Sequence, residues 1–259
     1  MKKFFIALLS LAHIVYAIDF SDIDVHIISL GEFDPPVSKL IIEEKDKQEI
    51  AKKVRKNQHN VMLLKGEGFN ALVDTGYSHT QGTLKEKLQA HGLGFGDITH
   101  IIITHAHPDH IGGILNDKGE LNFSNALMLI DEREYEFWLK SDNELIKRSL
   151  LALKDKKAFF DHSKPLFETQ TQVRALAAYG HTPGHNLISI EDTQAKIVFW
   201  ADLLHVYDVQ IQNPDITIAF DNDKQEALKT RKSYLELFKA QNVQVVGSHM
   251  PFSDPSYLP

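Results

Sequence analysis

The chain has 259 residues, of which 43% are hydrophobic, and it contains no cysteine. A chain of this length and composition can bury a substantial core, which excludes a disordered protein. Any metal site must use nitrogen and oxygen ligands only. The formal net charge is −7, and without a basic stripe or a nucleic-acid motif we expect no nucleic-acid partner.

The N-terminus has the pattern of a bacterial export signal. Two lysines precede an apolar run in residues 4–15, and Val15-Tyr16-Ala17 follows the small-x-small rule of a cleavage site. A histidine interrupts the run, which is shorter than the ~20 residues that a membrane-spanning helix needs. We therefore expect residues 1–17 to be a signal peptide and residues 18–259 to be one domain, periplasmic or secreted, without a stable membrane anchor.

The first half of this domain mixes strands and helices. Apolar and β-branched runs predict strands at residues 25–30, 61–65, 69–73, 98–103 and 126–130. The Gly66-Glu67-Gly68 turn joins two of them into a hairpin. The charged residues 45–60 indicate a solvated helix or loop. Leu84 and Leu88, four residues apart, predict a helix, and one or two more are expected in residues 132–157.

The second half is again rich in strands. They are expected at residues 173–177, 187–190, 196–200, 206–211 and 243–248. The stretch "DKQE" matches a capping box at Asp223, and the apolar spacing after it predicts a helix ending near Ala240. Since no Pro-, Gly- or Ser-rich linker separates the halves, the pattern favours one α/β domain with two sheets.

The densest group of possible metal-binding side chains is in "THAHPDHIGG", residues 104–113, directly after a predicted strand. Imidazole and carboxylate are the ligands that suit zinc and similar divalent ions. In this spacing His105 and His107 can converge on one ion, while Asp109 and His110 turn toward a neighbouring point. The loop therefore supplies halves of two metal sites, and the remaining ligands must come from elsewhere.

Three further stretches follow predicted strands and offer the missing ligands. They are "GHTPGH" at residues 180–185, "WADLLH" at residues 200–205 and "GSHM" at residues 247–250. Loops at strand ends gather at one edge of packed sheets, where function is usually carried. The remaining histidines are expected to be surface or hydrogen-bonded core residues: His13, His26, His59, His79, His91, His100 and His162.

Together with Asp74-Thr75-Gly76, these motifs resemble the metallo-β-lactamase fold superfamily, in its order and over most of the mature chain. The resemblance implies an αββα sandwich of two mixed sheets flanked by helices, with two divalent ions, zinc above all, at one edge. It implies a first ligand set of His105, His107 and His181, and a second of Asp109, His110 and His249, with Asp202 bridging both. Asp74 and His185 are implied to support the metal loops without binding metal.

The resemblance implies hydrolysis. Two divalent ions roughly 3.5 to 4 Å apart hold a hydroxide between them and polarise the bond under attack. Residues 205–238 look most like the branch that contains methyl parathion hydrolase and related exported lactonases and arylesterases. We expect a metal-dependent hydrolase acting on a lactone, aryl ester or phosphotriester. The alternatives are a glyoxalase II-like thioesterase, a β-lactamase-type hydrolase, or a catalytically weak periplasmic metal-binding module.

Asp109 and His205 are the candidate catalytic side chains for a small-molecule substrate. Related lactonases carry a tyrosine that contacts substrate where this chain has His205, whose imidazole could donate to a developing oxyanion. Candidates for an apolar pocket are Phe137, Trp138, Phe159, Phe160 and Phe220. The chain departs from the branch after "SHMPF", where "SDPSYLP" replaces a glycine-containing turn and further strand. A homodimer is also expected.

Overall fold

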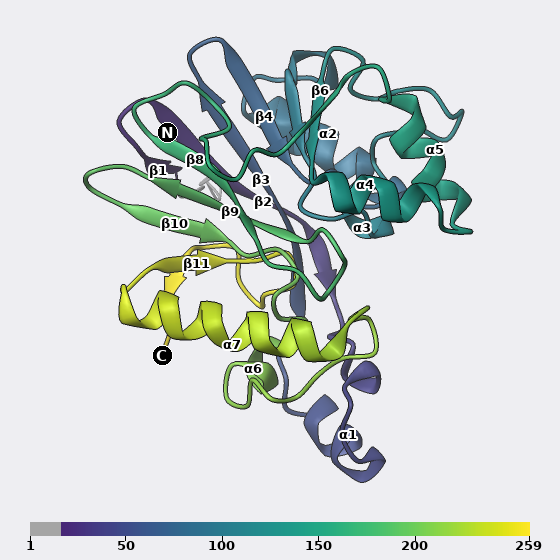
Figure 1. Ribbon diagram of the computed structural model, residues 1–259, viewed down its shortest axis with the longest axis vertical. Coiled ribbons are helices and arrows are strands. Elements are labelled where there is room, and N and C mark those ends of the chain that lie inside the picture. The colour runs from purple at the N-terminus through teal and green to yellow at the C-terminus, as the bar shows by residue number, and fades with distance from the viewer. Residues whose placement is uncertain (1–16) are drawn as a thin grey trace, which may run out of the picture.

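The computed structural model describes residues 17–259, so the expected signal peptide lies outside the described residues except for Ala17. The chain forms two sheets that face each other (Figure 1). The strands of the first sheet lie side by side in chain order: β1 (Ala17–Asp19), β2 (Ile23–Phe33), β3 (Asn57–Gly66), β4 (Phe69–Val73), β5 (His100–Ile102), β6 (Leu127–Ile130) and β7 (Lys157–Phe159). Pairing is antiparallel from β1 to β4 and parallel from β4 to β7.

The second sheet has five strands in the order β12-β11-β10-β9-β8. Their bounds are β8 (Gln172–Ala177), β9 (Asn186–Glu191), β10 (Lys196–Phe199), β11 (Gln244–Val246) and β12 (Ser256–Tyr257). β10 and β11 run parallel, while the other pairs are antiparallel. The stretch after "SHMPF" thus supplies a short edge strand, β12.

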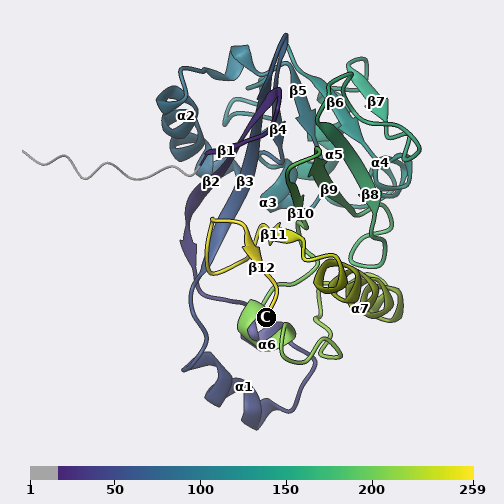
Figure 2. The same ribbon diagram turned by 90° about the vertical axis from the view of Figure 1, so that its left-hand side faces the viewer.

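Helices cover the outer faces of both sheets (Figure 2). The helices are α1 (Glu44–Ala51), α2 (Gln81–Ala90), α3 (Pro108–Ile111), α4 (Glu132–Leu139), α5 (Glu144–Ala152), α6 (Tyr207–Gln210) and α7 (Lys224–Ala240), with short 3-10 turns at Val37–Lys39, Ser78–Thr80 and Phe95–Asp97. α2, α4 and α5 pack on the first sheet, and α7 packs on the second. The αββα sandwich is therefore confirmed.

Alternation along the strands builds three apolar layers. In β3, Val61 and Leu63 face the helices while Met62 and Leu64 face the other sheet. Strand β10 repeats the pattern, since Ile197 and Phe199 enter the layer between the sheets and Val198 faces α7. A period of two residues sends successive side chains to opposite faces, so both faces of each sheet are apolar. The sheets form a rigid support for the loops at their edge.

The expected elements are mostly confirmed, with one clear error. Residues 206–211 were expected to be a strand, but they begin the helical turn α6. The Gln210 side chain accepts hydrogen bonds from the backbone N–H groups of His205 and Val206, at 2.8 and 3.0 Å, and closes this turn. The edge strands β1, β7 and β12 were not expected, because two or three residues carry no measurable alternation.

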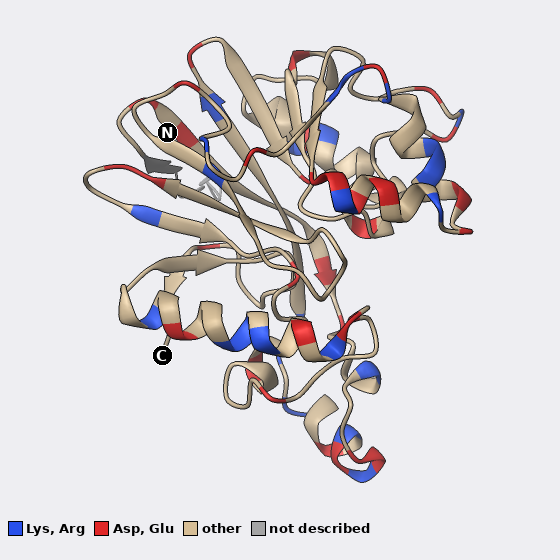
Figure 3. Ribbon diagram, in the orientation of Figure 1, with Lys and Arg blue, Asp and Glu red and all other residues tan. Residues whose placement is uncertain are grey.

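Most charged residues are on the helices and the connecting loops of the sandwich. Figure 3 shows both signs interspersed along α1, α4, α5 and α7, while the strands are largely uncharged. Within residues 17–259, no helix combines the length and apolarity required to cross a bilayer.

Candidate metal centre

The strand ends bring all seven expected ligands together at one edge of the sandwich. The 104–113 loop follows β5, the 180–185 loop joins β8 to β9, and Asp202 and His249 follow β10 and β11. The ligand atoms form two groups, and those within each group lie within 4.8 Å of one another: His105, His107, His181 and Asp202; Asp109, His110, Asp202 and His249. The structure thus assembles the two sets as the sequence motifs indicated, with Asp202 in both.

The first ligand set is compact and buried. The Nδ1 atom of His107 lies 3.1 Å from Nε2 of His105 and 3.0 Å from Nε2 of His181. Oδ2 of Asp202 lies 3.7 Å from Nε2 of His105 and 3.6 Å from Nε2 of His181. Ligands of a tetrahedral zinc ion are about 3.3 Å apart for bonds of about 2 Å. These separations bracket that value, so the set fits a zinc-sized cation.

The second set contains two carboxylates. Nε2 of His249 lies 3.1 Å from Oδ2 of Asp109 and 3.1 Å from Oδ2 of Asp202. Nε2 of His110 lies 3.2 Å from Oδ1 of Asp202 and 3.5 Å from Oδ2 of Asp109. Within residues 17–259, Nε2 of His110 and Oδ1 of Asp202 are buried without a hydrogen-bond partner. Buried polar atoms normally have partners, so these two atoms and their neighbours fit a second cation.

Sharp backbone turns at the strand ends present these side chains. Ala201, just before Asp202, and Asp74, just after β4, have φ of 47° and 61° in the left-handed region. Gly180, just before His181, has φ of 120°, and a Cβ there would lie 2.1 Å from the backbone nitrogen of Ala227. Only glycine tolerates both conditions. Such strain is typical of functional sites.

Asp74 supports the centre from behind, as the resemblance implied. It is 1% exposed. Its carboxylate accepts hydrogen bonds from the backbone N–H and the hydroxyl of Thr104, at 2.9 and 2.7 Å. It also contacts Nδ1 of His110 at 2.7 Å, which leaves Nε2 facing the second set. An outer carboxylate that orients a histidine in this way fixes both its ring and its tautomer.

The first set has its own outer support, part of which was missed by sequence reasoning. Asp221 contacts Nδ1 of His181 at 3.0 Å, and the buried Arg231 donates to Asp221 at 3.2 Å. The sequence does contain a signal of this support, since Arg231 stands on the apolar face of α7, four residues before Leu235. His185 donates from Nδ1 to the carbonyl of Ala178, and its Nε2 accepts the backbone N–H of Asp202 at 3.2 Å. It orients Asp202 and lies outside both ligand sets.

Burial and charge prepare the two sets differently. Burial lowers the pKa of His107 to about 4 and holds the pKa of His105 and His181 well below the usual value, so these rings are neutral. Burial also disfavours charge on His249, but Asp202 and Asp109 raise its pKa to about 9. A cation that binds the second set must displace this proton, whereas the first set is ready to bind.

A cavity of about 520 Å³ opens above the centre. Its floor is His107, Asp109, Asp202, His205 and His249, and its walls are Phe33, Asp34, Pro36, Tyr77, His79, Pro108 and Phe220. The two sides meet because Leu40 pairs with Ile218, which brings the segment after β2 beside the segment before α7. His79 is exposed, as expected, and also lines this cavity. His59 does have a core role and contacts the carbonyl of Asp109 at 3.0 Å.

Of the five aromatic residues proposed for the pocket, Phe220 alone lines this cavity. The Trp138 ring packs edge to face against His107, with ring centroids 5.4 Å apart. Phe160 packs against the core between the sheets, and Phe159 is exposed on β7. Phe33 and Tyr77 were missed, because the cavity is formed by segments distant in sequence.

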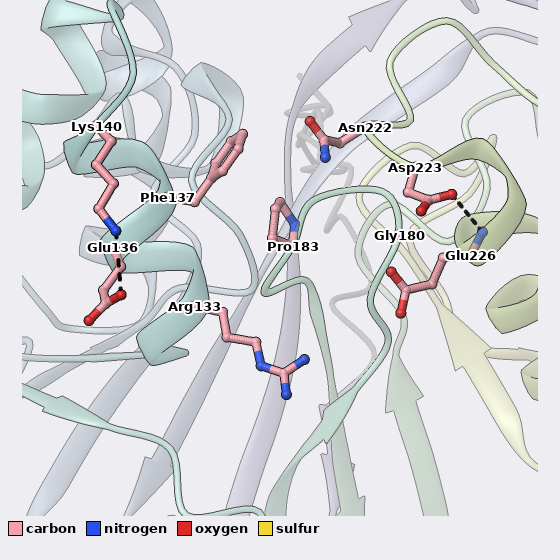
Figure 4. A pocket seen from close by; sticks show the side chains of 9 residues that line it. All are labelled: Arg133, Glu136, Phe137, Lys140, Gly180, Pro183, Asn222, Asp223 and Glu226. Carbon is pink, nitrogen blue, oxygen red and sulfur yellow. Dashed lines mark hydrogen bonds and ion pairs between the residues drawn. The ribbon is translucent and has the colours of Figure 1, made fainter.

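A second cleft, also of about 520 Å³, lies between α4 and the 180–184 turn (Figure 4). Phe137 and Pro183 face it among charged side chains. Lys140 pairs with Glu136 at 3.7 Å, and Asp223 caps α7. The cleft carries none of the ligand side chains, so the chemistry belongs to the first cavity.

An αββα sandwich with two His/Asp ligand sets at one edge is the arrangement that the sequence motifs implied. A family model described as the metallo-beta-lactamase superfamily matches residues 54–249, and the chain belongs to that superfamily. A curated relative, metallo-beta-lactamase domain-containing protein 1 from Xenopus laevis, is 36% identical over 80 residues. The match spans 30% of this chain and 30% of that relative.

Solved structures of similar fold include lactonases. AidC, a dizinc quorum-quenching lactonase in complex with a product, is 25% identical with a TM-score of 0.83, over 94% of this chain and 92% of that one. The hydrolase AbOPH of the beta lactamase superfamily is 24% identical with a TM-score of 0.82 over the same shares. A quorum-quenching N-acyl homoserine lactone hydrolase is 21% identical with a TM-score of 0.66, over 90% and 94%.

Proposed function

We propose that the protein is an exported hydrolase with two divalent ions, zinc by preference, which cleaves an uncharged ester-like bond in a lactone, aryl ester or phosphotriester. One observation carries the proposal: two ligand sets share Asp202 on the floor of an apolar cavity. The similarity to a dizinc lactonase supports both the metal and the lactone class. The branch resembling methyl parathion hydrolase remains part of the proposal.

The side chains divide the work of holding two ions. His105, His107 and His181 would hold the first ion, Asp109, His110 and His249 would hold the second, and Asp202 would be shared by both. Two divalent ions at such a centre would supply Lewis acidity and a hydroxide at neutral pH, proposed to lie between them. The cavity walls exclude water and orient the apolar part of the substrate.

The cavity also selects by charge. Phe33, Tyr77 and Phe220 provide its apolar walls, while Asp34 lies at the same rim. A substrate anion would meet this carboxylate, which disfavours like charge. An uncharged ester with an apolar substituent therefore fits these walls.

His205 and Asp109 are the proposed acid–base groups. The His205 ring is 1% exposed, lies on the cavity floor, and has no hydrogen-bond partner for either nitrogen within residues 17–259. Its Nε2 lies 3.2 Å from Oδ2 of Asp202, close to where the scissile bond must bind. We assign it to donate a hydrogen bond to the substrate oxygen that gains charge, and Asp109 to carry the proton to the leaving group.

The N-terminal segment adds a location to the proposal. Cleavage after Ala17 would release residues 18–259 into the periplasm or medium. N-terminal sequencing of protein from a bacterial host should then begin at Ile18, and an intact Met1 on cytosolic protein would contradict export. The homodimer stays a prediction, for which sedimentation of the purified chain is the measurement.

A hydrolysis panel with elemental analysis tests the function. We expect the purified chain to bind two divalent ions and to lose turnover on chelation, since every floor side chain is a ligand or contacts one. The panel holds a lactone, an aryl ester, a phosphotriester, a thioester and a β-lactam, with chelated protein as the control. Fastest turnover of the thioester or the β-lactam would replace the proposed substrate class, and no turnover with two ions bound would favour a metal-binding module.

The same panel tests the acid–base assignment. His205→Ala should keep both ions and lower turnover about 100- to 1000-fold, because it removes one hydrogen-bond donor to the developing charge. Phe220→Leu, at the wall beside it, is the matched control for altered cavity shape. Equal small effects of the two variants on kcat would refute a chemical role for His205.

A further inference from the structure

We propose that Glu134 is a positioning residue whose buried carboxylate joins the two histidine loops and sets the spacing of the first ligand set. The inference rests on the proposed metal centre and names a residue that belongs to neither ligand set. Glu134 lies in the first turn of α4 and is 0% exposed. A carboxylate in such a place is costly unless several donors surround it.

Four donors from three segments converge on this carboxylate. Oε1 accepts the backbone N–H of Ala106 at 2.8 Å and the indole N–H of Trp138 at 2.6 Å. Oε2 accepts the hydroxyl of Thr182 at 2.7 Å and the backbone N–H of Gly184 at 2.9 Å. All four acceptor positions of the carboxylate are therefore used.

The donors lie beside the three histidines of the first set. Ala106 stands between His105 and His107, and Thr182 directly follows His181. The two loops are more than seventy residues apart in the chain, yet Nδ1 of His107 and Nε2 of His181 lie 3.0 Å from each other. A single carboxylate that holds the backbone of both loops fixes this separation.

Two further contacts tighten the arrangement. The Trp138 ring, held by Glu134 through its N–H, packs edge to face on His107 at an interplanar angle of 72°. A Cβ on Gly184 would lie 2.4 Å from the backbone nitrogen of Glu134, so the 180–185 loop is pressed directly onto α4. Close approach of this kind requires glycine.

The second ligand set has different supports. Asp74 orients His110, and His59 contacts the backbone carbonyl of Asp109. Within residues 17–259, the Glu134 carboxylate makes no hydrogen bond to Asp109, His110 or His249, because its four donors belong to Ala106, Trp138, Thr182 and Gly184. Loss of the Glu134 carboxylate should therefore disturb one ion much more than the other.

Glu134→Gln is the decisive variant because it keeps the shape of the side chain. The amide has one acceptor oxygen, and its NH₂ group would face two of the four donors. We expect affinity for the first ion to fall about 10- to 100-fold, the range found when outer partners of metal ligands are removed. Affinity for the second ion should change by much less than about 10-fold, the lower end of that range.

The measurement is metal binding rather than turnover. Metal-free full-length chain is titrated with Co²⁺ against a competing chelator, and the visible absorption of each bound ion reports its coordination. Glu136→Gln is the matched control, since Glu136 lies two residues along the same helix with a side chain 61% exposed at the Figure 4 cleft. Circular dichroism confirms the fold; if Glu134→Gln does not fold, Thr182→Val removes one donor and should weaken the same ion by a smaller factor.

The outcomes separate the two proposals. Failure of the unmodified chain to bind two ions would overturn the dinuclear centre. If the unmodified chain binds two ions and Glu134→Gln binds them with the same affinities and spectra, the positioning role is overturned. Equal weakening of both ions would overturn it as well, because a general loss of structure then explains the effect. Selective weakening of one ion, with Glu136→Gln unchanged, supports it.

Discussion

The turnover of Asp202→Ala should be more than about 100-fold below that of the unmodified chain, and the variant should not keep two ions bound. This effect is larger than the loss expected for residues that only contact a metal ligand. Its two oxygens contact ligand nitrogens of both sets, at 3.7 Å from His105, 3.6 Å from His181, and 3.1 to 3.2 Å from His249 and His110. Without it, each set is left with three protein ligands and no shared atom. Turnover and elemental analysis of the purified variant are the measurements.

His185→Ala is the matched control for this prediction. His185 accepts the backbone N–H of Asp202 but belongs to neither ligand set, so its loss should cost at most about 10- to 100-fold. Circular dichroism of both variants must show an intact fold before rates are compared. Near-normal turnover of Asp202→Ala with two ions bound would show that the bridging assignment is wrong.

Asp74→Ala should destabilise the metal-free protein by about 3 to 5 kcal/mol, the cost of breaking a buried charged pair. Three donors would lose their acceptor inside the protein: the N–H and hydroxyl of Thr104 and Nδ1 of His110. Alanine also tolerates the left-handed backbone at this position, φ of 61°, less well than aspartate. Urea unfolding of the metal-free chain measures the free energy.

The exposed Asp117→Ala provides the reference for that measurement, with an expected change within about 0.5 kcal/mol. The reloaded Asp74→Ala protein should also bind the second ion more weakly, since the His110 ring loses its orienting partner. An unfolding free energy within about 1 kcal/mol of the unmodified chain would contradict the support role, because breaking a buried pair costs more.

The sequence by itself determined the fold class and the ligand types. Strand periodicity, the Asp223 helix cap and the hairpin turn are local, so nearest neighbours along the chain encode them. The same holds for His105 to His110, where a six-residue loop fixes the order of the side chains. Residues 206–211 show the limit of local pattern, because the bonds of Gln210 outweighed the strand propensity of that stretch.

Only the tertiary structure decided which atoms meet. In the sequence, Glu134 looks like an ordinary charged residue of an amphipathic helix, and Phe33 like the end of a strand. In the structure, Glu134 joins the two histidine loops and Phe33 lines the cavity. Asp202 comes to lie between both ligand sets because the ends of β5, β10 and β11 are held at one edge by the packing of the two sheets. Contacts between distant segments depend on how whole layers pack, and no short stretch of sequence specifies that.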